Sequence, residues 1–232
     1  MRKRLFIAAA ATLLIGASTG CAIKCRVNCT AVLVQLPCGP EKVKNGDFAG
    51  GKFMPNSSGV MPLPDSATDL SDWQIVNKNG PSSLLWVGAQ NGLGLVSQDG
   101  SNFINLFGSL PGPIPQLVQP LRVEPGRYLL QFAVGWDGVR NPKGIVTVNV
   151  SLGGQGTPPA TTHGTSPNHW ELFTDTFTIR PPGGTVTLQF QAAKDQVLGG
   201  PFPFIGLDSV TLKELLPFDS QACLPGTGVP IK

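Results

Sequence analysis

The chain has 232 residues, of which 41% are hydrophobic and 13% are charged, with 29 glycines and 22 prolines. This composition is too apolar for a disordered chain and too rich in Gly and Pro for long surface helices, so it indicates one all-β domain of many short strands. Three of the 17 basic residues, Arg2, Lys3 and Arg4, lie in the leader, which leaves 14 basic residues against 14 acidic ones. A neutral chain lacks the concentrated positive charge that nucleic acid binding requires, so we expect no nucleic acid partner.

Residues 1–20 have the order of an export signal. The basic start is followed by an apolar run over 5–16 and by small residues that lead to Cys21. This order predicts a signal peptide that is removed on export, and no later stretch reaches the roughly twenty apolar residues that span a membrane. Cys21 resembles a lipobox cysteine, the lipid-anchor site of bacterial lipoproteins, although Ser18 stands where an aliphatic residue is usual. We therefore expect an exported protein that is either lipid-anchored in the bacterial cell envelope, with no other membrane contact, or secreted.

The rest of the chain divides into a tether, a folded domain and a tail. A cysteine-containing tether is expected over 21–42, the folded domain over 43–216 and a loop-like tail over 217–232. Gly and Pro recur over 50–70, which predicts a long loop there. A short strand that runs into a polar turn is expected at 43–48. Further strands are expected at 72–77, 83–88 and 93–97, within 99–109, and at 116–123, 128–136, 145–152, 170–179, 184–192 and 204–212.

The strand over 128–136 shows the pattern most clearly. Its residues alternate with a period of two, which is the period of a sheet. One face carries Tyr128, Leu130, Phe132, Val134 and Trp136, and this phase predicts that Trp136 lies in the core. About ten such short strands, with no helical period, predict an all-β fold, an antiparallel two-sheet sandwich of jelly-roll type.

Four cysteines besides Cys21 form an even set, which suits two disulfides in an oxidising compartment. They are Cys25, Cys29, Cys38 and Cys223. Four cysteines allow three pairings, and all three remain open. We prefer Cys38 with Cys223 and Cys25 with Cys29, because the first and last strands of a jelly roll usually lie side by side.

A series of motifs carries a family resemblance. In chain order they are NGDF at 45–48, SDW at 71–73 in place of the usual PGW, LWVG at 85–88, the stretch 99–108, Gln116 with Gln119, the stretch 125–132, and IGLDSV at 205–210. This order is similar to that of the choice-of-anchor C family, the bacterial branch of the domain-of-unknown-function 642 group. Its members are galactose-binding-like jelly rolls, and the plant members associate with cell walls. The resemblance covers about residues 43–215 and implies a fold shared with carbohydrate-binding modules and a binding function.

The same resemblance implies a structural calcium ion near the first and last strands. Its ligands would be an acid after the NGDF motif and the Asp of the closing motif, which is Asp208 here. The first position is occupied by Ala49, so Asp47 or backbone carbonyls would have to serve, since calcium takes six to eight oxygen ligands. The alternative is that Asp47 and Asp208 cap turns.

Sugar binding combines an exposed aromatic ring with hydrogen-bonding side chains. The candidate residues are Trp86, Trp136, Asp137, Arg140, Asn141 and Trp170. Trp170, at the start of a strand, is the best-exposed candidate by its position, whereas the phase of Trp136 favours the core. The three polar residues follow Trp136 in a loop, where a polar turn is the alternative.

The leading hypothesis is therefore an exported, non-catalytic module that binds carbohydrate of a cell envelope or extracellular matrix. One alternative is a structural or adhesion protein that binds another protein at the cell surface. The other is a glycan-active hydrolase, for which Asp137, Glu171 and Asp175 would be the candidate acids. His163 and His169 do not assemble a catalytic triad or a metal site by their spacing. We expect no enzymatic activity.

Overall fold

The structure is a computed structural model, and it describes residues 20–24, 33–77, 80, 82–108, 113–136, 147–162, 168–193 and 204–216. The chain divides into two compact units, of which the larger is Gly39–Pro217 and the other combines Met1–Cys38 with Phe218–Lys232. Near the N-terminus, β1 (Gly20–Lys24) pairs antiparallel with β2 (Leu33–Glu41). The predicted signal peptide up to residue 19 lies outside the described residues. So do Cys25, Cys29 and Cys223, and both disulfide pairings stay predictions.

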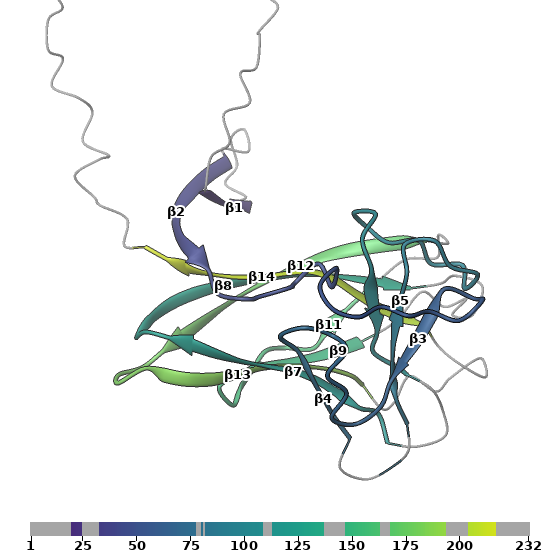
Figure 1. The fold of residues 1–232 in the computed structure, drawn as a ribbon. Helices are drawn as coiled ribbons and strands as arrows, with labels where there is room; N and C mark the ends of the chain where they lie inside the picture. Colours follow the sequence, from purple (N-terminus) through teal and green to yellow (C-terminus); the bar gives the residue numbers. More distant parts are fainter. Residues whose placement is uncertain are drawn as a thin grey trace, which may run out of the picture. The chain divides into compact units, whose positions relative to one another are not determined.

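The larger unit is built from strands in two layers (Figure 1). One sheet has the order β12-β8-β14-β6-β5-β3, and the other has the order β9-β13-β7-β4 with β10 and β11 beside β9. Every pairing is antiparallel. The strands are β3 (Val60–Leu63), β4 (Gln74–Val76), β5 (Leu84–Val87), β6 (Phe103–Asn105), β7 (Gln116–Val123), β8 (Gly126–Trp136), β9 (Thr147–Leu152), β10 (Gln155–Gly156), β11 (Ala160–Thr161), β12 (His169–Ile179), β13 (Gly184–Ala192) and β14 (Ile205–Leu215).

The connections between the sheets define a jelly roll. The chain crosses from one sheet to the other at each step from β6 to β9 and again at each step from β12 to β14. As a result β14 lies between β6 and β8, and β13 lies between β7 and β9. This is the topology of a double Greek-key sandwich, so the predicted antiparallel two-sheet jelly roll is confirmed.

The core lies between the two sheets and follows the predicted alternation. In β8, the residues from Tyr128 to Trp136 in the expected phase are buried, and in β9 Val148, Val150 and Leu152 are buried while Asn149 is exposed. Trp136 belongs to this core, as its phase predicts. A second, smaller apolar cluster lies apart from the main core and consists of Val60, Val87, Leu95, Phe103 and Phe204.

Three expected elements are different in the structure. Residues 43–48 form the expected polar turn without the short strand before it, because Asn45 and Phe48 both have left-handed backbones, with φ of 51° and 52°. Residues 93–97 are irregular because Asn91 binds the carbonyls of Gly88 and Leu95 through its side chain and curls this segment. The expected long loop over 50–70 contains β3, which pairs with β5.

Within the described residues, no helix has the length and apolar character required to cross a membrane.

Candidate functional site

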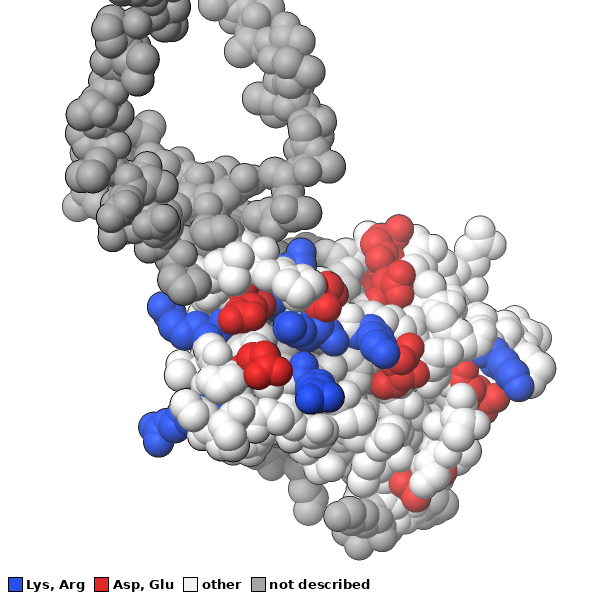
Figure 2. Space-filling view, turned by 60° about the vertical axis from the view of Figure 1, so that its left-hand side comes forward, with Lys and Arg blue, Asp and Glu red and all other residues white. Residues whose placement is uncertain are grey.

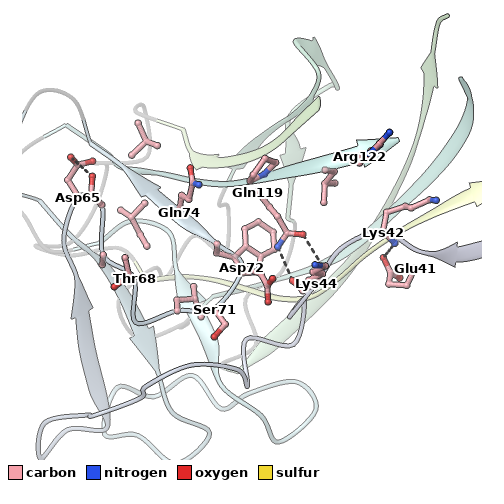
Figure 3. A pocket seen from close by; sticks show the side chains of 18 residues that line it. Glu41, Lys42, Lys44, Asp65, Thr68, Ser71, Asp72, Gln74, Gln119 and Arg122 are labelled. Atoms are coloured by element: carbon pink, nitrogen blue, oxygen red, sulfur yellow. Dashed lines mark hydrogen bonds between the residues drawn. The ribbon is translucent and has the colours of Figure 1, made fainter. Parts of the chain in front are cut away.

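An open cleft of about 1020 Å³ lies at the edge of the sandwich, beside β4 and β7 (Figure 3). One wall is the end of β7, from Gln119 to Arg122, and the other is the segment 41–44. The base is formed by residues 65–76, which include β4. The cleft forms here because β4 pairs only with residues 116–118 of β7, so the edge of β7 beyond them has no strand beside it in the described part of the chain.

The two walls are held together by one amide side chain. Gln119 donates from Nε2 to the carbonyl of Lys44 and accepts the Lys44 N–H on Oε1, both at 2.9 Å (Figure 3). The same segment is bonded to the other sheet, because the Lys42 N–H donates to the Leu212 carbonyl and the Val210 N–H donates to the Gly46 carbonyl, both at 2.9 Å. The cleft therefore has walls anchored in both sheets.

Two of the sequence motifs, NGDF at 45–48 and SDW at 71–73, meet at the base of the cleft. Asn45 donates from Nδ2 to the Ser71 carbonyl (2.9 Å), and the Trp73 indole donates to the Asn45 carbonyl (2.9 Å). The Trp73 ring packs against Phe48 and Phe190 at centroid distances of 5.5 and 6.3 Å. Trp73 is only 2% exposed, so it shapes the base but offers no open ring face for a sugar.

Several polar side chains of the cleft are exposed and have unused hydrogen-bonding capacity. Asp72, Gln74 and Arg122 are exposed, and their side chains make no hydrogen bond within the described part of the chain. Asp72 has a left-handed backbone with φ of 66°. This conformation is costly for a residue other than Gly and is often found at binding sites. Such groups are suited to the hydroxyls of a ligand.

The other two acids of the cleft are occupied by the protein itself. Glu41 Oε1 accepts the N–H groups of Lys42, Val43 and Leu212 at 3.0, 2.9 and 2.7 Å. Asp65 accepts the Asn77 N–H at 2.6 Å and the Ser66 hydroxyl at 3.3 Å. These two carboxylates therefore stabilise the walls, and they lie at opposite ends of the cleft (Figure 3).

Two of the expected aromatic candidates are core residues instead. Trp86 and Trp136 are both fully buried, and neither presents a ring face to solvent. The Trp86 indole donates to the Phe48 carbonyl at 3.0 Å. The Trp136 indole N–H has no hydrogen-bond partner among the described residues, and its ring packs against His169 at a centroid distance of 4.7 Å.

Trp170, the candidate expected to be most exposed, is half-buried on the outer face of its sheet. Its indole donates to the Val96 carbonyl at 2.8 Å, and its ring meets Phe103 edge-on at a centroid distance of 5.5 Å. The ring lies over Gly135 and Gly206, where any side chain would collide with it. The remaining candidates, Asp137, Arg140 and Asn141, lie outside the described residues.

Asp208 is fully buried at a β-bulge of β14. It accepts the N–H of Ser209 at 2.7 Å and that of Gln98 at 3.3 Å, and the Ser97 hydroxyl at 3.4 Å. Burial, together with the negative charge of Asp99, raises the pKa of Asp208 to about 7. At neutral pH this carboxyl is therefore divided between its charged and neutral forms.

Asp99 is the acid whose charge acts on Asp208. Burial alone would raise the Asp99 pKa, but hydrogen bonds from the side chain and backbone of Ser101 and from the Ser97 hydroxyl outweigh it and lower the pKa. The other acid of the expected calcium site, Asp47, is exposed and accepts the Ala49 N–H at 3.2 Å. Its backbone carbonyl accepts the Ser101 hydroxyl at 2.9 Å, which links it to Asp99.

This arrangement bears on the calcium ion that the family resemblance implies. Asp208, Asp99 and the Ser97 hydroxyl supply fewer than the six to eight oxygens that calcium takes. Within the described residues no group of three His, Cys, Asp or Glu side chains could hold a metal ion. Backbone carbonyls and water would have to complete the shell. Two neighbouring acids, among the described residues without a basic partner, nevertheless form negative surroundings that suit a cation.

The candidate acids for hydrolysis do not form a catalytic pair on β12. Glu171 and Asp175 are four residues apart on one strand, which separates them by roughly 13 Å along it. Glycosidases hold their two carboxylates about 5–9.5 Å apart. Asp137 lies outside the described residues.

No family model matches the chain, and no curated protein matches it. Similar solved structures include a CBM4 structure, with 17% identity over 74% of this chain and 98% of that one and a TM-score of 0.43. TmCBM61 in complex with β-1,4-galactotriose has 14% identity over 76% and 99%, with a TM-score of 0.38. A family 35 carbohydrate binding module from Clostridium thermocellum has 14% identity over 65% and 98%, with a TM-score of 0.37. These carbohydrate-binding modules resemble the chain in fold at low sequence identity.

Proposed function

We propose that this protein is an exported, non-catalytic jelly-roll module that binds carbohydrate of a cell envelope or extracellular matrix through the cleft beside β4 and β7. The observation that carries the proposal is the set of free polar groups in that cleft. Asp72, Gln74 and Arg122 are exposed and have no hydrogen-bond partner within the described chain. Together they offer both donors and acceptors for sugar hydroxyls.

The dimensions of the cleft support a ligand of a few sugar rings. Its volume of about 1020 Å³ is at the upper end of the roughly 300–1,000 Å³ of small-molecule pockets. Leu70, Ile75 and Leu121 also contribute to the lining, but they are buried like Trp73, so contact with a ligand depends on the exposed polar side chains. An open shape suits an internal segment of a polymer.

The acids of the cleft support binding without catalysis. Hydrolysis of a glycoside needs an acid and a second carboxylate on opposite sides of the bond. Glu41 and Asp65 are occupied by backbone N–H groups at opposite ends of the cleft, and only Asp72 lies between them with a free carboxylate (Figure 3). A single carboxylate serves as a hydrogen-bond acceptor for hydroxyls.

Binding to soluble polysaccharides, measured by affinity electrophoresis with the full chain, tests the proposal. We expect retardation by at least one envelope or matrix polysaccharide, and we expect Asp72→Ala and Gln74→Ala to weaken it. Thr176→Ala, an exposed position on β12 outside the cleft, should leave the mobility unchanged. Absence of retardation by every polymer in a panel of wall and matrix glycans would refute carbohydrate binding.

A second function, adhesion to another protein, is favoured by an apolar patch on the outer face of the sheet that contains β12. Val96 and Leu172 are 57% and 59% exposed, and half-buried Trp170 is hydrogen-bonded to Val96. Trp170 and Leu172 are two apart on β12 and so share one face. If this patch is the functional surface, Leu172→Asp would abolish binding to a surface protein and leave polysaccharide binding intact.

For localisation we propose export followed by lipidation of Cys21 in the bacterial cell envelope, with secretion as the alternative. The order of basic, apolar and small residues over 1–20 supports this proposal. Mass spectrometry of the mature N-terminus decides between the two. A diacylated Cys21 supports the anchor, and an unmodified mature chain in the medium refutes it.

We also propose that calcium binds beside Asp208 and Asp99. The support is the family resemblance together with two neighbouring acids, of which Asp208 is fully buried. A bound cation would compensate their charge and fix the segment 97–101 against β14.

A further inference from the structure

Positive side chains gather at one end of the cleft. Lys42 and Lys44 come from the segment that follows β2, and Arg122 comes from β7. Figure 3 shows these three residues at the end opposite Asp65. Among the described residues, none of the three takes part in an ion pair.

The acid at this end does not neutralise the three cations. Glu41 is directed to the backbone, where its Oε1 accepts three N–H groups. Counting its charge, this end still carries a net charge of +2. Asp72 in the middle of the cleft and Asp65 at the other end make the whole lining neutral, so the positive charge is confined to this end. On the face drawn in Figure 2, basic and acidic side chains are intermingled.

The backbones of Lys44 and Arg122 are held in place by hydrogen bonds and strand pairing. Lys44 is fixed by both hydrogen bonds of Gln119, and Arg122 lies in β7 opposite Thr185 of β13. Preorganised positions reduce the entropy that binding costs. A guanidinium also matches the planar geometry of a carboxylate with two parallel hydrogen bonds.

We propose, on the basis of the carbohydrate binding proposed above, that the ligand of this cleft is an acidic saccharide of the uronate class. Its carboxylate lies against Arg122 and Lys44, and the hydroxyls of the same chain reach Asp72 and Gln74. The free carboxylate of Asp72 disfavours a densely sulfated polymer, because each additional negative charge near it is repelled. A carboxylate at the positive end of the cleft, with hydroxyls along the rest of it, suits this distribution of charge.

The test uses one polymer in two charge states. Polygalacturonate and its methyl-esterified form share a backbone and differ in the carboxylate, so the full chain is titrated with each by isothermal calorimetry. We expect tighter binding to the acid form, with an affinity that falls as salt is raised. Lys44→Gln should lower the affinity for the acid form about fivefold and leave binding to the ester unchanged. Arg122→Gln should weaken binding to both forms, and to the acid form more strongly, because Arg122 also faces the hydroxyls.

Matched controls remove a charge outside the cleft. Lys52→Gln and Arg180→Gln lie at exposed positions that do not line it, and they should bind both polymers as the wild type does. Circular dichroism and thermal unfolding verify that each variant is folded, which is expected because Lys44 and Arg122 are exposed.

The outcomes separate this inference from the proposed function. Equal affinity for acid and ester, unaffected by the cleft variants, overturns the acidic ligand while carbohydrate binding survives. Two results would overturn the acidic-saccharide proposal in favour of unspecific charge attraction. One is binding to dextran sulfate as tight as binding to polygalacturonate, and the other is a loss of affinity in the control variants as well. If uronate polymers and neutral polymers both fail to bind, the proposed function itself is refuted.

Discussion

Replacing Asp208 by Asn should stabilise the protein at alkaline pH in the absence of calcium. The substitution keeps the shape of the side chain and removes its charge. The amide oxygen introduced by Asp208→Asn can still accept the Ser209 N–H, and the amide N–H can donate to the Ser97 hydroxyl or to Asp99. The Gln98 N–H loses its acceptor in the variant, a cost that does not depend on pH and is smaller than the penalty on the buried charge.

The size and sign of the effect follow from the pKa. Burial and the charge of Asp99 raise the pKa of Asp208 from 3.8 to about 7 in the folded protein. Between these two values the folded state holds a proton that the unfolded state has released, so stability falls as the pH rises and the loss is complete above about pH 7. This difference in the pKa of Asp208 lowers the free energy of unfolding of the wild type at alkaline pH by on the order of 4 kcal/mol.

Urea unfolding of wild type and variant in EGTA, at about pH 4.5 and about pH 8, measures this penalty. The free energy of unfolding of the wild type should fall by a few kcal/mol relative to the variant between these conditions. Asp175→Asn, at a half-buried position of β12, is the control for loss of an acid. A difference between wild type and Asp208→Asn that stays constant with pH would show that Asp208 is charged in the fold at both values, and the reasoning would be wrong.

Three further predictions concern the calcium site, the walls of the cleft and the turn at Gly46. Millimolar calcium should raise the melting temperature of the wild type but not of Asp208→Asn, and an equal response in both would exclude Asp208 as a ligand. Gln119→Ala should cost about 1–3 kcal/mol in urea unfolding, because it leaves the Lys44 N–H and carbonyl without partners; Gln155→Ala, which removes a single exposed bond, should cost less. Gly46→Ala should cost about 3 kcal/mol or more, because a methyl group would collide with the Val210 carbonyl. Gly92→Ala, with open space around it, should be nearly neutral, and comparable losses for both would contradict the packing argument.

The regular part of the fold was predictable because it depends on local alternation. The strands β8, β9 and β13 each repeat apolar residues with a period of two, so their inward faces could be assigned from sequence. The turn at Asn45 and the curled segment after Asn91 were not predictable in this way. Both are determined by side-chain hydrogen bonds to backbone groups, including one from Asn45 to Ser71, 26 positions away in the chain.

The cleft was less accessible to sequence reasoning than the core. Aromatic residues were the expected signal, but Trp86 and Trp136 are buried, and the free groups are Asp72, Gln74 and Arg122. Asp72 and Gln74 are two positions apart in the sequence, but only the pairing of β4 with β7 brings Arg122 to the same cleft. One local sign was present, since SDW at 71–73 departs from the usual motif at the position where Asp72 enters the cleft.

The position of β14 determines when, during synthesis of the chain, its sheet can form. The last strand of the sequence lies between β6 and β8, so that sheet cannot close until residues 205–215 have been synthesised. This sheet therefore stays incomplete through most of translation, because its β14 position is still empty. A product truncated before Ile205 would leave the facing edges of β6 and β8 bare and ready to pair with other chains. Folding of this sandwich is thus coupled to completion of the chain.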